Sequence, residues 1–267
     1  MLKRIRSVKP KIIETDCTPY SLCILPNNHL LASDFNNNRL LVYDKNFILV
    51  RTITTINNIL INAVSLETNQ KDRIYIGNYS TNVLLSVDLN FKLMQTYGTN
   101  ISQSVVQPQT TTLFLPFDIK FYENSLFICD FNNKRILKLN LNLSIEASYH
   151  VTYQPWQIKI LNDIACIRPS QLNLIYFYDI NASFSLKYKY DTLYNGPICT
   201  LDSRYFYQLN LSNKKFTCYD STGRCLDEDQ VVAMDDHSNI IFHSHASCIL
   251  FDNQFILVAT QKRFILF

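Results

Sequence analysis

The sequence predicts an all-β protein assembled from a repeated four-stranded unit, and three observations support this. Apolar runs rich in Ile, Leu, Val, Tyr and Phe alternate with clusters of Asn, Asp and Ser, and helical periodicity is nearly absent. The stretch SDFNNNRLLVYD, from Ser33 to Asp44, recurs 96 residues later as CDFNNKRILKLN. The same succession of strands and turns surrounds both copies and returns at other points of the chain.

The repeated unit can be followed through the chain from the residue that ends its second strand, as Asp34 does. The equivalent anchor residues are Asn78, Asp130, Pro169, Asn210 and Ala259. A third strand ends ten residues beyond each of the first five anchors, at Asp44, Asp88, Asn140, Asp179 and Asp220. The first strands read YSLCIL, INAVSL, FDIKFY, WQIKIL and ICTL. Four strands in each unit of roughly 40–50 residues are typical of a β-propeller blade.

The repeat count predicts a six-bladed β-propeller with four-stranded antiparallel blades, formed by residues 1–267 as a single domain. The last unit stops after its third strand, whereas the N-terminal segment 3–14 reads as a strand without a place in the repeat. We therefore expect segment 3–14 to supply the outer strand of the last blade, so that no sheet edge is left open at the point of closure.

Composition narrows the classes of function. The chain has 267 residues, of which 47% are hydrophobic, and a net charge of +3. Its pI near 8.3 is below the value of about 9 that marks a nucleic-acid-binding domain, so DNA is not an expected partner. No apolar run approaches the roughly 18 residues that span a membrane. Most of the eight cysteines lie in apolar strands and form no CxxC pair, which predicts reduced thiols, a cytoplasmic location and no metal. We expect a monomer without a cofactor.

The stretches ASDFNNNRLLVYD and ICDFNNKRILKLN resemble the NHL-repeat family of β-propellers. In that family Asp ends the second strand of a blade and Arg opens the third, as Asp34 with Arg39 and Asp130 with Arg135 do here. The blade of Asn78 lacks both the acid and the Arg, and the later blades keep only the succession of strands. The resemblance implies that the face carrying these turns binds proteins or single-stranded RNA.

A structural role for Asp34, Arg39, Asp130 and Arg135 follows from their spacing. An Asp and an Arg five residues apart across a hairpin turn lie on neighbouring strands, within reach of a charge-assisted hydrogen bond. The Asn residues between them tolerate the left-handed conformation that such turns require. We expect an exposed clamp that contributes about 0–1 kcal/mol and fixes the strand register.

Aromatic and polar side chains gather on the same predicted face. Tyr20, Phe117 and Trp156 each follow a proline at the start of a first strand. The turns between second and third strands add Phe35, Asn36, Asn37, Tyr79, Phe131, Asn132, Asn133 and Lys134. Two interpretations stay open for the aromatic residues. They either pack as wedges between blades or form a binding platform anchored on Trp156 and Tyr20.

The function that these patterns favour is a non-catalytic module that recognises a protein partner through this face. One alternative is a single-stranded RNA-binding propeller, although few Lys and Arg accompany the aromatic residues. Another is a calcium-dependent lactonase or lyase, for which first-strand acids such as Glu67, Asp118, Asp202 and Asp252 would have to converge. His243 and His245 alternate on one strand and are weak candidates for a metal site, because their spacing matches no standard ligand set.

Overall fold

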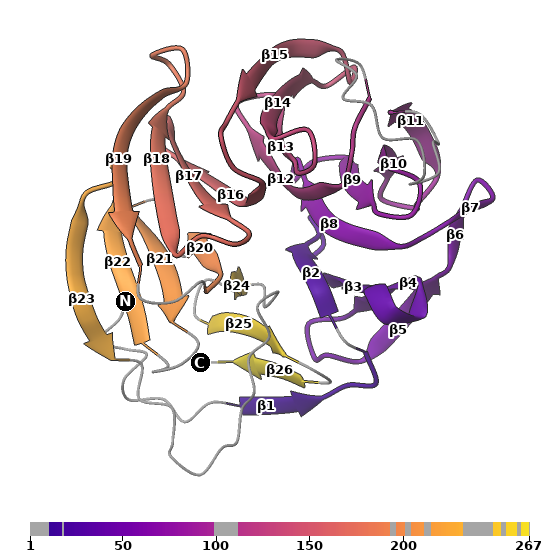
Figure 1. Cartoon of the computed structure of the whole chain (residues 1–267). Helices are drawn as coiled ribbons and strands as arrows, with labels where there is room; N and C mark the ends of the chain where they lie inside the picture. Colours follow the sequence, from indigo (N-terminus) through magenta and orange to yellow (C-terminus); the bar gives the residue numbers. More distant parts are fainter. Residues whose placement is uncertain are drawn as a thin grey trace. The chain divides into compact units, whose positions relative to one another are not determined.

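The computed structural model describes residues 11–17, 19–98, 112–192, 196–200, 204–210, 215–231, 248–251, 255–260 and 263–266 (Figure 1). Apart from the short 3-10 turn η1 (Phe35–Asn37), the regular structure of these residues is β-strand. The chain divides into two compact units, Pro19–Ile158 and the combination of Met1–Thr18 with Lys159–Phe267. No linker marks this division in the sequence, because the boundary falls inside strand β16 (Pro155–Leu161).

The unit Pro19–Ile158 contains three sheets, each made of four strands that follow one another in the chain and pair antiparallel. The first has β2 (Pro19–Ile24), β3 (Leu30–Asp34), β4 (Arg39–Tyr43) and β5 (Leu49–Ile53). The second has β8 (Ala63–Thr68), β9 (Arg73–Asn78), β10 (Val83–Asp88) and β11 (Leu93–Tyr97). The third has β12 (Pro116–Tyr122), β13 (Ser125–Asp130), β14 (Arg135–Asn140) and β15 (Ile145–His150). A small ribbon of β6 (Thr55–Ile56) and β7 (Ile59–Leu60) precedes the second sheet.

The other unit continues the same plan. One sheet joins β16 to β17 (Ile164–Pro169), β18 (Leu174–Asp179) and β19 (Ser185–Asp191). The next has β20 (Ile198–Thr200), β21 (Tyr205–Asn210), β22 (Lys215–Asp220) and β23 (Cys225–Val231). A further sheet draws on both ends of the chain and pairs β1 (Lys11–Glu14) with β26 (Arg263–Leu266), followed by β25 (Phe255–Thr260) and β24 (Cys248–Phe251).

The described chain therefore shows five blades that each consist of four consecutive strands, one fewer than the six predicted. The difference lies in the sheet that combines the two chain ends, in which β1 pairs with β26 over Lys11–Glu14. The rest of the predicted N-terminal strand, residues 3–10, lies outside the described residues. Second strands end at the predicted anchors Asp34, Asn78, Asp130, Pro169 and Asn210.

A repeated Asx turn explains the residues at the ends of the third strands. The side-chain Oδ1 of Asp44 accepts hydrogen bonds from the backbone N–H groups of Asn46 and Ile48. Asp88, Asn140 and Asp220 accept the same pair of bonds in their own blades, from the residues two and four positions further on. This local hydrogen bonding ends each third strand and turns the chain towards the fourth strand.

Asparagine is the most frequent residue at the left-handed positions of the described chain, with seven of the seventeen non-glycine cases. Asn38 has φ 51° and Asn82 has φ 54° at the position that precedes a third strand, and Lys134 holds the same place with φ 49°. Asn adopts this conformation more readily than most residues because its side chain can hydrogen-bond locally. Asparagine thus adopts here a conformation for which glycine is otherwise the default residue.

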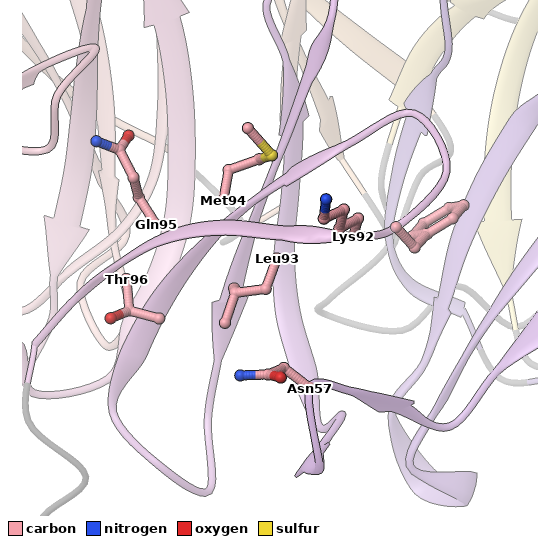
Figure 2. A pocket seen from close by; sticks show the side chains of 7 residues that line it. Asn57, Lys92, Leu93, Met94, Gln95 and Thr96 are labelled. Atoms are coloured by element: carbon pink, nitrogen blue, oxygen red, sulfur yellow. The ribbon is translucent and has the colours of Figure 1, made fainter.

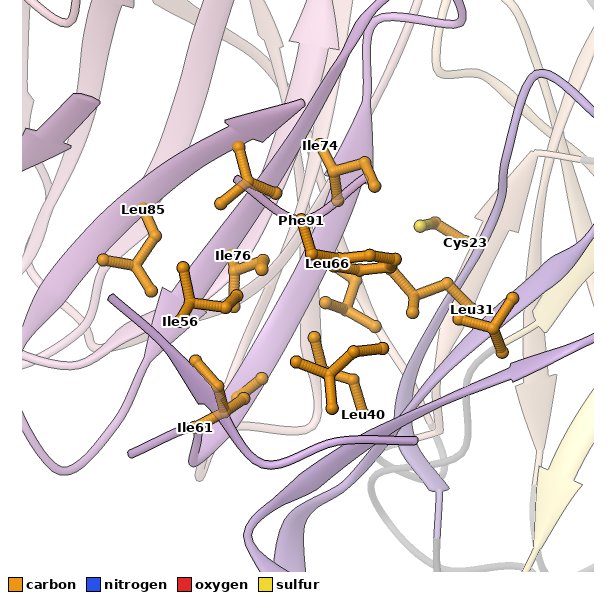
Figure 3. Close-up of a cluster of buried hydrophobic side chains, with 14 of the residues drawn as sticks. Cys23, Leu31, Leu40, Ile56, Ile61, Leu66, Ile74, Ile76, Leu85 and Phe91 are labelled. Atoms are coloured by element: carbon orange, nitrogen blue, oxygen red, sulfur yellow. The ribbon is translucent and has the colours of Figure 1, made fainter. Parts of the chain in front are cut away.

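The core of the unit Pro19–Ile158 forms where neighbouring sheets pack together. One cluster joins buried side chains of the first two sheets, among them Leu31, Leu40, Ile76 and Leu85, around the ring of Phe91 (Figure 3). Full burial of a side chain of this size contributes about 1.5–3 kcal/mol. A second cluster joins the second and third sheets, so the second sheet packs against a neighbour on either side.

The cysteines that the structure describes are free thiols, and all but the half-buried Cys225 are buried. Burial raises the pKa of the Cys23 and Cys166 thiols well above the ordinary value. These residues therefore act as small apolar side chains, as predicted. Within the described residues, no helix has the length and apolar character to cross a membrane.

Candidate binding site

The turn between β13 and β14 is held by a buried cluster of charged and polar groups. Arg135 Nε donates to Asp130 Oδ2 at 2.6 Å, and the Asn133 amide donates to the same oxygen at 2.8 Å. Asp130 Oδ1 accepts the backbone N–H of Phe114 at 2.7 Å. The Asp130 side chain is fully buried and that of Arg135 is 3% exposed. The paired residues also face each other in the strand register.

The first copy of the motif has the same arrangement. Asp34 Oδ2 accepts hydrogen bonds from Arg39 Nε at 2.7 Å and from the Asn37 amide at 2.8 Å. Asp34 is fully buried and the Arg39 side chain is 25% exposed. The expectation of exposed clamps is therefore wrong, because the carboxylates lie beneath the turn instead of on its surface. The loss of one partner of such a buried pair costs about 3–5 kcal/mol, well above the cost at an exposed pair.

The blade between these two copies reaches the same result without a charge. Asn78 Oδ1 accepts the backbone N–H of Asn62, 16 residues earlier, just as Asp130 accepts that of Phe114. The Asn78 amide donates to the carbonyl of Leu60 and to Thr81 Oγ1. One amide side chain therefore supplies both the acceptor and the donor that this position requires.

Six aromatic side chains of the unit Pro19–Ile158 form one contiguous cluster, which we call the aromatic face. Phe117 is central: its ring centroid lies 4.3 Å from that of Trp156 and 4.5 Å from that of Phe131. It also contacts Tyr79 at 6.3 Å and Tyr20 at 6.5 Å. Phe35 joins the cluster through Tyr20 at 5.2 Å and Tyr79 at 5.4 Å. All six side chains are partly exposed.

The backbone explains why these rings meet. Pro19 pairs with Asp34 and Pro116 with Asp130, so each first strand begins beside the turn between the second and third strands. A β-bulge follows each proline, between Pro19 and Leu22 and between Pro116 and Ile119. Bulges redirect the side chains that they carry. The bulges carry Tyr20 and Phe117, which thereby contact the aromatic residues of the turns.

The polar residues predicted for this face differ in their roles. Asn36 and Lys134 are exposed at the turns, and Asn37 is exposed while it donates to Asp34. Asn133 is half-buried and belongs to the clamp, since its amide donates both to Asp130 and to the carbonyl of Thr112.

Asn132 accepts a hydrogen bond from the Gln154 side chain. Sequence reasoning missed Gln154, although it lies two residues before Trp156, within the segment that leads into a first strand. His243 and His245 lie outside the described residues.

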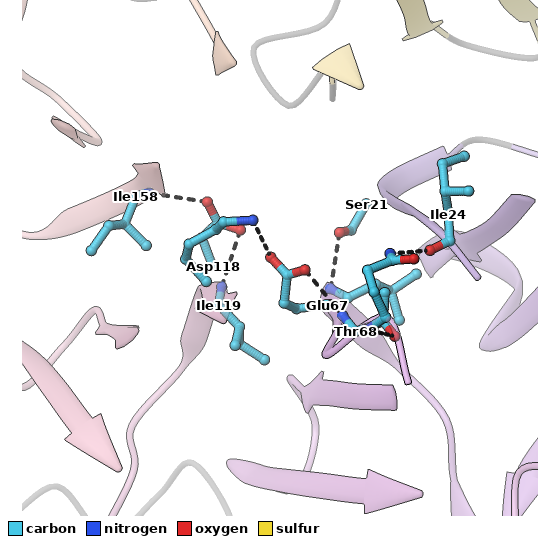
Figure 4. Close-up of polar contacts among 10 residues, drawn as sticks. Ser21, Ile24, Glu67, Thr68, Asp118, Ile119 and Ile158 are labelled. Carbon is cyan, nitrogen blue, oxygen red and sulfur yellow. Dashed lines mark hydrogen bonds and ion pairs between the residues drawn. The ribbon is translucent and has the colours of Figure 1, made fainter. Parts of the chain in front are cut away.

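The first strands carry a second set of polar side chains, whose bonds run from blade to blade (Figure 4). Ser21 Oγ accepts the backbone N–H of Leu66, and Ser65 Oγ donates to the carbonyl of Pro116. Asp118 Oδ2 accepts the N–H of Ile158, and its Oδ1 accepts the N–H of Ile119. These side chains tie β2 to β8, β8 to β12 and β12 to the start of β16.

The acids considered for catalysis are engaged in such contacts. Both carboxylate oxygens of Asp118 accept backbone N–H groups, and Glu67 forms an ion pair with Lys120 at 3.1 Å (Figure 4). Asp202 and Asp252 lie outside the described residues. In the part of the chain that the structure describes, no group of three or more His, Cys, Asp and Glu side chains could hold a metal ion.

A shallow hollow of about 420 Å³ lies along β11, on an outer strand and apart from the aromatic face (Figure 2). Its lining includes Asn57, Leu93, Met94 and Gln95. The buried Oε1 of Gln95 has no hydrogen-bond partner among the described residues. No sequence motif pointed to this hollow.

Comparison with known proteins identifies the fold. No protein-family model matches the sequence, and no curated protein does. Among solved structures, a streptogramin B lyase matches with a TM-score of 0.69 and 13% identity over 96% of this chain and 97% of the lyase. A catalytically inactive H270A virginiamycin B lyase from Staphylococcus aureus, solved with quinupristin, matches with a TM-score of 0.69 and 11% identity over 97% and 99% of the two chains. Kuenenia stuttgartiensis hydrazine synthase matches with a TM-score of 0.61 and 13% identity over 92% and 75%.

The chain thus has the fold of an all-β propeller with four-stranded antiparallel blades. At sequence identities of 11–13%, the match shows a shared fold and does not show a shared activity. Since no family model matches, membership of the NHL-repeat family stays a prediction.

Proposed function

We propose that this β-propeller is a recognition module that binds a protein partner through the aromatic face. The observation that carries the proposal is the convergence of six partly exposed aromatic side chains, from separate turns and strands, into one cluster. Clustered aromatic residues dominate the energetics of many protein interfaces, because each buries a large apolar area at a small cost in side-chain entropy. Buried clamps and inter-blade hydrogen bonds beneath the cluster hold its backbone rigid.

The packing of the rings favours a protein over single-stranded RNA. Bases stack on exposed ring faces, whereas Phe117 and Trp156 stack on one another with 21° between their planes. RNA also requires cations along the backbone. In the turns of this face Lys134 is exposed, while Arg39 and Arg135 form ion pairs with buried aspartates.

A catalytic function has less support from the described residues. The lyases with this fold make an enzymatic role the natural alternative. However, Asp118 and Glu67 are engaged with backbone groups and with Lys120, which leaves these two acids poorly placed to bind calcium or substrate. The calcium-enzyme alternative predicts that calcium raises the melting temperature and EDTA lowers it.

Two features of the architecture, the number of blades and the type of turn, are also proposals. We infer that the sheet formed by β1, β26, β25 and β24 acts as a sixth blade, as its four-stranded antiparallel order supports. The turns that begin at Asp34 and Asp130 would then be NHL-type turns, supported by their matching Asp, Asn and Arg hydrogen bonds.

The test compares partners captured by the wild type with those captured by a Tyr20→Ala, Trp156→Ala double variant. Tyr188→Ala serves as a matched control, because Tyr188 is 38% exposed on β19 and belongs to no part of the aromatic face. We expect specific protein partners to be lost from the double variant and kept by the control. Equal capture by all three proteins would overturn the proposal, as would salt-sensitive capture of RNA alone.

A further inference from the structure

We propose that Asp130, Asn133 and Arg135 are positioning residues of the aromatic face, which hold Phe131 and Phe117 in place against Trp156. The importance of this role for recognition rests on the proposed function, whereas the positioning itself is a property of the isolated protein. The inference goes beyond a hairpin clamp, because the hydrogen bonds of this cluster leave the hairpin.

The cluster ties two chain segments together. Arg135 Nη2 donates to the carbonyl of Thr112 at 2.9 Å, and the Asn133 amide donates to the same carbonyl at 3.0 Å. Asp130 Oδ1 accepts the N–H of Phe114. Thr112 and Phe114 belong to the segment that leads directly into Pro116 and Phe117. The three side chains therefore anchor the turn that bears Phe131 to the segment that delivers Phe117.

Backbone bonds complete the connection. The N–H of Phe131 donates to the carbonyl of Leu115, and the N–H of Asn132 donates to that of Phe114, both at 3.1 Å. The rings of Phe131 and Phe117 then meet at 4.5 Å, and Trp156 contacts both, at 5.6 Å and 4.3 Å. A loosened clamp would allow the two phenylalanines to separate and would expose more of the indole to water.

The neighbouring blade shows that the same task can be done without charge. Asn78 binds backbone groups 16 and 18 residues earlier, the N–H of Asn62 and the carbonyl of Leu60. The corresponding groups 16 and 18 residues before the anchor Asp130 are the N–H of Phe114, which Asp130 binds, and the carbonyl of Thr112, which Asn133 and Arg135 bind. The repeat positions of Asp130, Asn133 and Arg135 are occupied in the neighbouring blade by Asn78, Thr81 and Val83. The turn of this blade presents Tyr79 to the aromatic face. The shared element is the pair of backbone bonds and not the ion pair.

This equivalence supplies a rescue experiment. Arg135→Val removes one of the two donors to the carbonyl of Thr112 and leaves the Asp130 carboxylate without its cation. The triple variant Asp130→Asn, Asn133→Thr, Arg135→Val installs the residues of the neighbouring blade. Trp156 is the single tryptophan of the chain, so its emission and its quenching by acrylamide report directly on the aromatic face.

We expect Arg135→Val to shift the emission of Trp156 to the red and to raise its acrylamide quenching constant, and the triple variant to restore both. Arg135→Val with wild-type emission and quenching would overturn the proposal, as would a folded triple variant that behaves like Arg135→Val. If Arg135→Val does not fold, Asn133→Ala keeps the ion pair and removes the amide that donates to Thr112 and to Asp130. It should then produce a smaller shift of the same sign, and no shift would count against the proposal.

The readout needs no partner, so the two proposals fail separately. If the emission of Trp156 behaves as expected but partner capture is the same for wild type and Arg135→Val, positioning stands and recognition through this face is wrong. If emission is unchanged while Tyr20→Ala, Trp156→Ala abolishes capture, recognition stands and the positioning role is wrong.

Discussion

The indole of Trp156 stacks on the ring of Phe117 although the two residues belong to successive first strands, β16 and β12. Phe117 contacts four of the five other rings of the aromatic face, whereas each of the others has fewer contacts in it. The integrity of the face therefore depends on Phe117 more than on any other of its side chains.

Phe117→Leu should disturb the aromatic face without unfolding the protein. Aromatic pairs contribute about 0.5–1.5 kcal/mol beyond the area that they bury, so we expect the free energy of unfolding to fall by about 1–2 kcal/mol. Trp156 should emit further to the red. Phe121→Leu, on the same strand but packed against a buried core cluster, is the control and should leave the emission of Trp156 unchanged. Equal shifts in both variants would contradict the central role of Phe117.

Gly77, on β9 of the second sheet, lies close to Pro116 of the third sheet in the unit Pro19–Ile158. A Cβ at this position would stand 2.1 Å from Ser65 Oγ and 2.7 Å from the carbonyl oxygen of Pro116, the two atoms joined by an inter-blade hydrogen bond. We expect Gly77→Ala to lower the free energy of unfolding by about 1–3 kcal/mol in chemical denaturation. Ser65→Ala loses only the hydrogen bond, about 1 kcal/mol, and should be milder. A Gly77→Ala protein as stable as the wild type would show that the sheets can move apart at no cost.

The pH dependence of stability should carry a contribution from Asp130. Burial raises the pKa of this carboxyl above its ordinary value, although Arg135, the Asn133 amide and the N–H of Phe114 favour the ionised form. A group whose pKa is raised by folding contributes stability below its unfolded pKa, about 3.9, and this contribution is lost as the pH rises through the folded pKa.

The free energy of unfolding of the wild type, relative to that of Asp130→Asn, should therefore fall as the pH rises from about 4. Denaturant titrations of both proteins across this range measure the difference. A difference that increases with pH would mean that Arg135 outweighs burial. Because the cost of burying the Asp130 carboxylate outweighs its attraction to Arg135, we also expect the Asn, Thr and Val of the neighbouring blade to replace Asp130, Asn133 and Arg135 without loss of stability.

Gln95 should be a site where an apolar residue stabilises the protein. Its Oε1 is buried with no hydrogen-bond partner among the described residues, and an unsatisfied polar group of this kind costs about 1–3 kcal/mol. Gln95→Leu should raise the melting temperature in calorimetry. Thr96→Leu, at an exposed neighbour on the same strand, should not. A lower melting temperature for Gln95→Leu would indicate that the oxygen has a partner in solution.

The blade plan could be predicted from the sequence because local hydrogen bonding enforces it. The acids and amides at the ends of third strands are regularly spaced because each closes an Asx turn. The aromatic residues of the face could be selected because they recur at two fixed places, after the proline of a first strand and after the anchor residue. These residues come into contact because the strand register pairs each proline with its anchor residue, Pro19 with Asp34 and Pro116 with Asp130, and this pairing recurs with the repeat.

Other features have no local signal. The burial of Asp130 depends on a segment that precedes it by some 16 residues in sequence, so the clamp looks exposed when only the hairpin is considered. Asn78 alone does what Asp130, Asn133 and Arg135 do together in the next blade. This equivalence is apparent only from the backbone N–H and carbonyl groups that they bind in the preceding segment. The repeat could be followed through the five blades of consecutive strands, whereas the sheet at the chain ends could be expected only from the N-terminal strand that has no place in the repeat, and β1 does pair with β26.

The most direct test of recognition through the aromatic face uses the single tryptophan. Protein labelled with 5-fluorotryptophan gives one fluorine resonance, from position 156, and an unlabelled partner adds none. Addition of a captured partner should move or broaden this resonance with a saturable dependence on concentration, and the Tyr188→Ala control should behave like the wild type. A complex that forms by size-exclusion chromatography while the Trp156 resonance stays unchanged would place the interface elsewhere and contradict the proposed function.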